Sequence, residues 1–460
     1  MRRILPLLAA ALLPTSAQAA GFYFTDSGTR AIGRGSAVVA SVDDLSALYH
    51  NPAALARLRE AQAFVSISGV DQYVEFDRMD EEGEDPFAPI NNSGPFMVVP
   101  GLGLSHSFGV PRTTFAVGFI SPQAPDPLYP NDGPQRYSLT DELLWEFAAV
   151  AGAGVQITDW LALGATFQAR MLRAQMALAL TTAEGDNPSQ DIDIGFEISD
   201  WFAPNFQVGT IVDPLPWMTI GASYQPATNY HTSGSIAADF EGHTWEGFLD
   251  GTNFVDEDVT AEITMPAIAR AGIDFHPSDR WDVEIAGAWE GWHVWDEIVI
   301  TDVDLTIEMD PENIMGLGDA VVTNDIVIPA AYQNVWSVRL GGDYDLHEKF
   351  TIRAGGYYET SAVPDKFQGV TLVDGRKVGV GLGAGLHLGR VDLDAAFGET
   401  FIIPRDITDS ELQQLVLDLD LAHPELSEVG NGKIVGNGKF SSRLTFLSMA
   451  MTWRFGKEPA

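Results

Sequence analysis

Three shortages narrow the class of protein before any motif is considered. The 460-residue chain has no cysteine, which excludes a disulfide framework and a thiolate metal site. It has 26 Lys and Arg against 64 Asp and Glu, a formal net charge of −38, which argues against nucleic acid as a partner. Beyond residue 19 it has no run of about 18 consecutive apolar residues, which excludes transmembrane helices.

The first residues have the layout of a secretory signal peptide. Arg2 and Arg3 precede a short apolar run over residues 4–13, and the small residues Ala17 and Ala19 suit a cleavage site. The run is too short for a permanent membrane anchor, although an uncleaved anchor is the alternative. We therefore expect residues 1–19 to be removed on export, leaving a mature chain that starts at Ala20.

Apolar and polar residues alternate through most of the mature chain. In the last segment, residues 439–455, one face carries Leu447, Met449, Met451, Trp453 and Phe455, and the other carries Ser448, Ala450, Thr452 and Arg454. The same split recurs in residues 350–358 and in residues 280–295, where Trp295 is assigned to the apolar face. In residues 377–388 the polar face is replaced by glycine. This period of two predicts strands with one face toward lipid and one toward a lumen, with room inside for another segment.

Segments of this kind number about fourteen, an even number, as bacterial barrels require. They lie near residues 61–76, 96–109, 112–120, 143–158, 160–182, 196–209, 217–240, 258–276, 280–301, 330–346, 349–360, 375–388, 390–402 and 439–455. Short turns alternate with long loops, as periplasmic turns and extracellular loops do in such barrels. The sequence thus predicts an all-β, transmembrane antiparallel β-barrel over residues 61–460, with both of its ends in the periplasm. A soluble β-sandwich does not explain this regular asymmetry.

Two loop features have alternative interpretations. The long loops gather acids, among them Asp80, Glu81 and Glu82, which solvate the surface or bind divalent cations that bridge to lipopolysaccharide. No spacing amounts to a cation-binding loop, so no metal site is predicted. In residues 403–438, Leu412, Leu415, Val416 and Leu419 recur at helical spacing. They form an extracellular apolar ledge or pack onto the barrel rim.

Residues 20–60 neither alternate nor face lipid, and their small residues predict a compact plug, or hatch, inside the barrel. The candidate hatch residues are Gly21, Phe22, Gly33, Arg34, Gly35, Asp43, Asp44, Asn51 and Pro52. They include a Gly-Arg-x-small element, an Asp-Asp pair and an Asn-Pro-Ala motif. With these motifs the chain resembles the FadL/TodX family of outer-membrane transport proteins for long-chain fatty acids and aromatic hydrocarbons. Turn formation, helix capping and close packing also account for these residues.

Scarce basic residues fall on the predicted lumen face: Arg170, Arg270, Arg339, Arg353 and Lys377. A guanidinium can hold a carboxylate by paired hydrogen bonds, so Arg170, Arg339 and Arg353 are candidates for the head group of a fatty acid. The resemblance favours Arg170. The alternative is structural pairing with a lumen carboxylate such as Glu284 or Glu290.

The resemblance implies an outer-membrane protein that passively transports hydrophobic molecules, with long-chain fatty acids as the first expectation and aromatic hydrocarbons as the alternative. It also implies that the hatch shifts and that the substrate leaves sideways through the wall near the third strand, residues 113–121. We expect a monomer in contact with lipopolysaccharide that is not an enzyme and has no cofactor. The remaining alternatives are a lipid hydrolase, for which only His293 and His387 lie in mid-strand contexts, and a structural barrel or adhesin.

Overall fold

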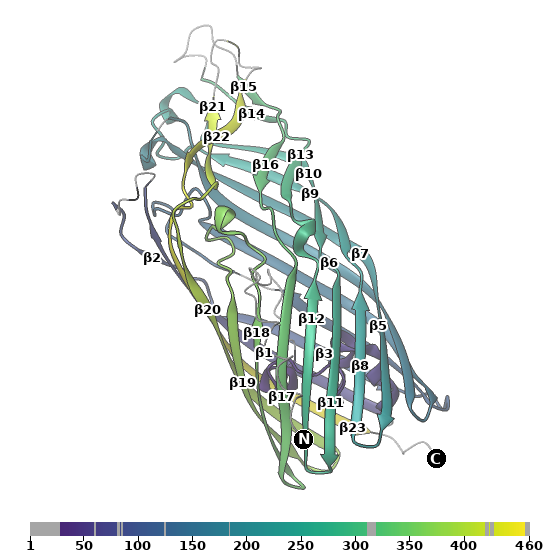
Figure 1. The fold of residues 1–460 in the computed structure, drawn as a ribbon. Coiled ribbons are helices and arrows are strands. Elements are labelled where there is room, and N and C mark those ends of the chain that lie inside the picture. The colour runs from purple at the N-terminus through teal and green to yellow at the C-terminus, as the bar shows by residue number, and fades with distance from the viewer. Residues whose placement is uncertain are drawn as a thin grey trace, which may run out of the picture.

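A closed antiparallel barrel of fourteen strands forms the body of the protein, as the sequence predicts (Figure 1). The computed structural model describes residues 28–58, 61–80, 83, 86–123, 126–183, 185–310, 319–418, 423 and 427–455. Ala61 at the start of β1 pairs with Phe455 at the end of β23, and this ladder closes the barrel. The signal peptide, Gly21 and Phe22 lie outside the described residues.

Each of the fourteen wall strands is called a stave here, because some of them consist of two consecutive strand elements separated by a bend. The strands of the wall are β1 (Ala61–Arg78), β3 (Met97–His106), β4 (Thr113–Gln123), β5 (Asp141–Thr158), β6 (Leu161–Thr181), β7 (Asp191–Leu215), β8 (Met218–Gln225) with β9 (Thr228–Asp239), β10 (Asn253–Met265) with β11 (Ile268–Ser278), β12 (Trp281–Glu290) with β13 (Glu297–Thr301), β16 (Ile326–Pro329) with β17 (Val335–His347), β18 (Phe350–Glu359), β19 (Lys377–His387), β20 (Val391–Ile407) and β23 (Gly438–Phe455). The extracellular loops add β2 (Ile90–Asn91), β14 (Leu305–Ile307), β15 (Ala320–Val322), β21 (Gln413–Asp418), β22 (Glu428–Ile434) and the single turns η2 (Pro188–Gln190), η3 (Glu246–Phe248) and η5 (Asp365–Phe367). A further turn, η4 (Trp292–Val294), lies at the bend between β12 and β13.

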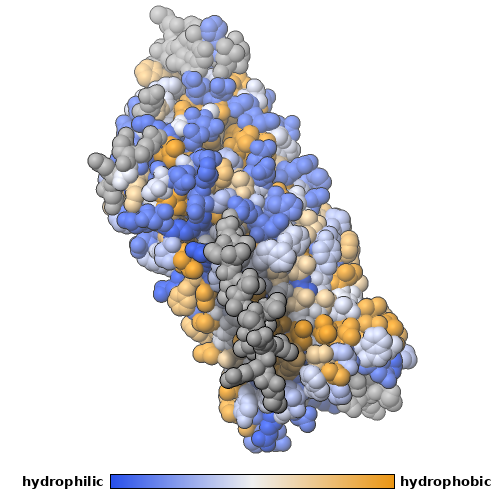
Figure 2. Space-filling model, in the orientation of Figure 1, coloured by the Kyte–Doolittle hydropathy of each residue, from blue (hydrophilic) through white to orange (hydrophobic). Residues whose placement is uncertain are grey.

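The alternating apolar and polar residues of the sequence lie on the outer and inner faces of the wall, respectively. In β23, Leu447, Met449 and Trp453 are exposed, whereas Ser448 and Thr452 are buried in the interior. Figure 2 shows the resulting change along the molecule, with hydrophobic residues gathered on the lower half and hydrophilic residues prevailing above. The outward apolar residues face lipid, and the strands extend beyond this band into the extracellular space.

The N-terminal segment lies inside the barrel. It comprises α1 (Thr29–Gly33), α2 (Ala47–His50) and η1 (Pro52–Arg57), and most of its side chains are buried against β5, β6, β7 and β20. The inner glycines permit this fit. A Cβ at Gly381 would lie 1.9 Å from the carbonyl oxygen of Ile32, and a Cβ at Gly341 would lie 2.0 Å from that of Arg34. The bare inner faces of β17 and β19 therefore let the hatch backbone touch the wall.

Several local expectations are wrong. The strands predicted for residues 217–240 and 258–276 are each divided by a bend, into β8 and β9 and into β10 and β11. The continuous strand predicted for residues 280–301 is interrupted after Glu290 by η4, and Trp295, assigned to the lipid face, is buried in the interior. Gly291 and the turn η4 that follows it break the alternation of inward and outward side chains, so the pattern that starts at Trp281 does not extend to Trp295. Residues 413–418 form a strand, β21, rather than a structure with helical spacing, because they pair with β22 in a hairpin. No helix in the described ranges is long and apolar enough to cross a membrane.

Candidate functional site

Arg34 fixes the hatch to the barrel wall. Its guanidinium, buried on the inner face, donates to Asp343 at 2.6 Å and to Asp282 at 2.5 Å, and lies 3.8 Å from Asp274. These acids come from β17, β12 and β11, so one side chain joins the hatch to three adjacent staves. A buried cation with several carboxylates in contact remains charged and holds its place.

Arg30 makes a second cluster, against β20. It pairs with Asp43 and approaches Asp44 within the hatch, and it reaches Asp392 at 3.4 Å and Asp394 at 3.2 Å in β20. Asp44 also accepts hydrogen bonds from Ser46. The predicted Asp-Asp pair therefore belongs to the anchoring of the hatch.

A wall carboxylate and a hatch amide complete the anchoring. Glu284 of β12 accepts hydrogen bonds from the backbone N–H groups of Val39, Ala40 and Ser41 at 2.7 to 3.0 Å. Asn51 donates to the carbonyl of Thr210 in the wall and, through its side-chain oxygen, caps η1, which begins at Pro52. Gly33 and Gly35 lie against Gly383 and Gly356. The hatch is thus fixed by charge, by hydrogen bonds and by close packing.

The three candidate arginines already have carboxylate partners in the protein. Arg170 pairs with Glu146, Arg339 with Glu359 at 3.3 Å, and Arg353 with Asp343 at 3.0 Å and Asp394 at 2.7 Å. The partners differ from Glu284 and Glu290, but the arrangement is the structural pairing that the sequence left open. Removing such an arginine would leave a buried acid without its cation.

Arg270 differs from these three. Its guanidinium lies 4.7 Å from the centre of the Tyr49 ring in α2. Among the described residues, no carboxylate lies within salt-bridge distance of it, although it is buried.

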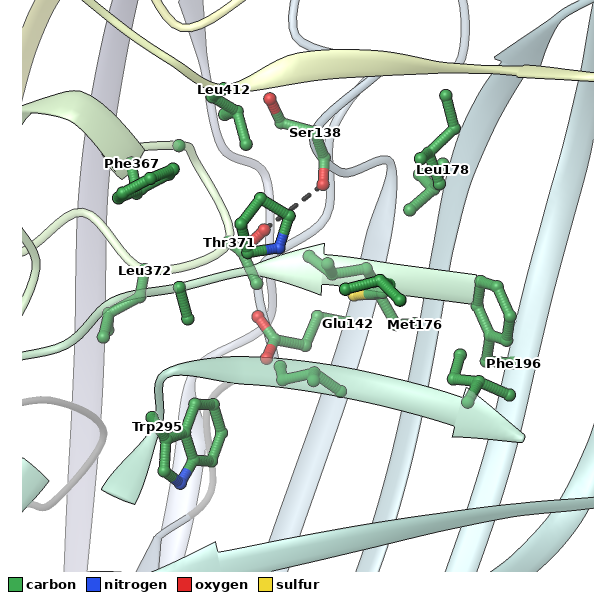
Figure 3. A pocket seen from close by; sticks show the side chains of 18 of the residues that line it. Ser138, Glu142, Met176, Leu178, Phe196, Trp295, Phe367, Thr371, Leu372 and Leu412 are labelled. Atoms are coloured by element: carbon green, nitrogen blue, oxygen red, sulfur yellow. Dashed lines mark hydrogen bonds between the residues drawn. The ribbon is translucent and has the colours of Figure 1, made fainter. Parts of the chain in front are cut away.

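An apolar pocket lies at the extracellular mouth (Figure 3). Its cavity of about 190 Å³ is enclosed by upper strand ends and by the loops, including Phe196, Trp295, Tyr332, Phe367 and Leu412. Leu415 of the β21–β22 hairpin also lines it, so the apolar residues of that loop cover a cavity. An apolar cavity of about 150 Å³ suffices for benzene. The pocket has room for a small hydrophobic molecule.

The carboxyl groups in the pocket lining are both glutamates, and no basic residue accompanies them in the described lining. Among the described lining residues there is no Lys, Arg or His, and the two charged residues are Glu142 and Glu411. Glu411 is half exposed and pairs with Lys366. Glu142 is 6% exposed, and its Oε2 has no hydrogen-bond partner among the described atoms. Figure 3 places it between Met176 and Trp295, among apolar side chains.

Glu142 lies above the apolar band of the barrel. It pairs in register with Met176, beyond Arg173 and Gln175, whose side chains bond to Glu197 on the outer surface. Burial in the pocket raises the pKa of the Glu142 carboxyl to about 8, and the neighbouring Asp141 and Asp126 act in the same direction. The acid is therefore uncharged at neutral pH.

The wall is incomplete between the second and third staves. β3 pairs with β4 only from Leu102↔Phe119 to His106↔Phe115, whereas its upper part, from Met97, pairs with β1 alone. Pro100 lies in this upper part and has no N–H to donate to a ladder. A cavity of about 40 Å³ at this gap is lined by Pro100, Ile120, Tyr49 and the first described hatch residue, Gly28.

These features agree with what is found in known proteins. Residues 10–422 match the family model described as outer membrane protein transport protein (OMPP1/FadL/TodX). The chain belongs to this family. A FadL homologue of Pseudomonas aeruginosa, 18% identical, has a similar fold with a TM-score of 0.73, over 95% of this chain and 100% of that one.

Two solved toluene transporters are also similar in fold. TbuX of Ralstonia pickettii is 16% identical with a TM-score of 0.63, over 93% of this chain and 98% of the other. TodX of Pseudomonas putida is 14% identical with a TM-score of 0.64, over 96% and 100%. The family model identifies this member as an outer-membrane protein that transports hydrophobic compounds, and the family and its structural neighbours are channels, not enzymes.

The two histidines considered for a lipid hydrolase make structural contacts. His293 of η4 bonds to Asn334. His387 lies between Asp392 and Thr351, both 2.9 Å away, at the end of the barrel opposite the pocket. Thr351 is buried and donates to Asp345. The contacts of His387 with Asp392 and Thr351 thus belong to the packing of the periplasmic end.

Sequence reasoning missed Glu142. The available signal was strand parity, because Glu142, Leu144, Glu146 and Ala148 alternate on the inward face of β5. Of the two acids in this set, Glu146 pairs with Arg170, whereas Glu142 has no ion-pair partner among the described residues.

Proposed function

We propose that this family member lets small, uncharged hydrophobic molecules diffuse from the extracellular mouth pocket into the barrel and leave sideways between β3 and β4. The observation that carries the proposal is the combination of an apolar pocket above, a firmly anchored hatch below and an unpaired stretch of wall between them. The hatch blocks the straight path to the periplasm. A hydrophobic solute that leaves through the wall enters the lipid without crossing water.

Uncharged substrates fit the pocket better than fatty-acid anions do. A carboxylate that loses its water must find a cation or donors, or its transfer into an apolar site is costly. The pocket offers no basic residue in its described lining, and Arg170, Arg339 and Arg353 are occupied by protein acids. We therefore favour aromatic or other neutral hydrocarbons over the long-chain fatty acids expected from the sequence.

Fatty-acid transport is the second candidate, and Arg270 is the observation in its favour. This guanidinium lies deep in the lumen beside Tyr49, without a carboxylate within salt-bridge distance among the described residues. A head group could pair with it while the tail occupies the lumen. Arg270→Gln should then lower oleate uptake at least tenfold and leave toluene uptake unchanged, whereas under the leading proposal neither changes.

The lateral exit is tested by closing it. Because the chain has no cysteine, thiols introduced at Val99 and Ser121, which both line the cavity at the gap, would be the only ones present. Joining them with a short, reducible bifunctional reagent should lower toluene uptake at least tenfold in a toluene-degrading host that lacks its own transporter, and reduction should restore it.

A matched pair controls for the reagent. Leu104 and Val117 are direct partners in the intact part of the same ladder, so a crosslink there should leave uptake unchanged. Equal uptake with the gap open and crosslinked would refute the lateral route.

The maturation and environment of the chain are also proposals. We propose that residues 1–19 are removed on export, that residues 20–60 form the hatch, that the protein acts as a monomer and that its outer loops contact lipopolysaccharide. N-terminal sequencing of the protein from outer membranes and its mass in detergent test the first and third of these statements.

A further inference from the structure

Glu142 gives the mouth pocket a polar partner that an alkane or toluene cannot use. The acid points into a cavity whose other described walls near it are Met176, Phe196 and Trp295. The carboxyl is nine-tenths buried, and Oε2 has no partner in the described structure. A buried polar atom without a partner costs free energy that a ligand can recover by bonding to it.

The residues around Glu142 determine which polar group a ligand can place next to it. Asp141 on the same strand and Asp126 in the preceding loop are acidic, and Glu411 is paired with Lys366. The hydroxyl groups of Tyr129 and Tyr332 also lie near Glu142. No described lining residue is basic, so an anionic group would lie among acids without a cation. An uncharged hydroxyl can donate to Glu142 whether the acid is protonated or not.

We propose that Glu142 is a specificity-determining residue, and that the mouth pocket prefers a small apolar molecule with one uncharged hydroxyl group, such as a phenol or an aliphatic alcohol. The apolar body of the ligand contacts the aromatic and aliphatic walls while its hydroxyl donates to the Glu142 carboxyl. This inference rests on the proposed function, because it names the substrate class of the same pocket.

The volume supports a single ring. A cavity of about 190 Å³ exceeds by a small margin the size known to accept benzene, which leaves room for a methyl and a hydroxyl substituent. Removal of one hydrogen-bond partner from a buried site typically changes affinity by about tenfold.

The test compares three ligands that share a methyl-substituted benzene ring and differ in the group opposite the methyl. The full-length protein in amphipol is titrated by calorimetry at about pH 7 with 4-methylphenol, toluene and the 4-methylbenzoate anion. We expect 4-methylphenol to bind about tenfold more tightly than toluene and at least tenfold more tightly than 4-methylbenzoate. Glu142→Leu should remove the preference for the phenol over toluene, and Glu142→Gln, which keeps a hydrogen-bonding amide, should retain most of it.

Two controls make the result decisive. Glu262→Leu makes the same change at an exposed acid on the outside of β10 and should leave all three affinities unchanged. Heat-modifiable migration on gels verifies that each variant has a folded barrel. Toluene binding that persists with no preference for the phenol, or a preference that survives Glu142→Leu, would overturn the inference and leave the proposed function intact. Failure of all three ligands to bind would overturn the pocket's role in the proposed function and the inference with it.

Discussion

The hatch and the mouth pocket differ in whether their buried charged residues have partners of opposite charge. In the periplasmic half, Arg30 and Arg34 of the hatch each contact several carboxylates, most of them from the wall. In the extracellular half, the pocket is apolar and its one deeply buried acid, Glu142, has no described cation near it. Ion pairs hold the hatch in place, whereas the described lining of the mouth pocket has no basic residue and leaves room for a hydrophobic ligand.

The difference shows why lumen arginines alone do not identify a substrate. Arg353 lies inside the barrel as predicted, but it shares Asp343 with Arg34 and Asp394 with Arg30. It therefore joins the two anchor clusters of the hatch to each other. A buried, saturated arginine stabilises the plug, whereas an unpartnered polar group in an apolar cavity is a candidate for ligand contact.

The largest expected effect comes from breaking the anchored half. Arg34→Ala leaves Asp274 and the partly buried Asp282 without their cation and leaves Asp343 with Arg353 alone, which typically costs about 3–5 kcal/mol. We expect a loosened hatch and a barrel that admits small sugars in liposome-swelling assays. The matched control is Arg112→Ala, which removes an exposed ion pair with Asp159 at a periplasmic turn and should have little effect.

A smaller effect should follow from thickening the wall beneath the hatch. Gly381→Val places a Cβ within 1.9 Å of the carbonyl oxygen of Ile32, so either the hatch or β19 must move. We expect a lower midpoint of urea-induced unfolding in lipid and a moderate leak. Leu382→Val, on the lipid face of the same strand, should change neither. A Gly381→Val protein as tight and stable as the parent would show that the hatch does not press against this strand.

Sequence patterns predict the anchored half better than the pocket. Because one face of each strand contacts lipid, apolar residues recur at every second position and make the strands visible in the sequence. The glycines of β19 lie where the hatch backbone contacts the wall, so residue type also indicates that contact. The pocket is assembled from upper strand ends and loops that are far apart in the chain, such as Glu142, Trp295 and Leu412. The turn η4 places Trp295 on the inner face instead of the predicted outer face, and β21 is a strand because it pairs with β22. Counting the spacing of apolar residues cannot show either effect.

The smallest expected effect is a pH dependence confined to the pocket. Because the pKa of Glu142 is raised to about 8, the group is neutral below that pH and becomes a carboxylate above it. A bound anion then faces a second anion, so the affinity for 4-methylbenzoate should fall by about tenfold from about pH 7 to about pH 9. The affinity for 4-methylphenol should change much less over this range, since its hydroxyl can donate to either form of the acid.

Glu142→Gln separates this titration from all others. The amide stays neutral, so the affinity for 4-methylbenzoate should become independent of pH over the same interval, while the anchored half, whose guanidiniums stay charged throughout, contributes nothing. If the fall persists in Glu142→Gln, another group is responsible, and Glu142 is not the charge that a ligand meets in the pocket. If the fall disappears, ionisation of Glu142 in the pocket controls the affinity for the anion, and the ion pairs that anchor the hatch do not.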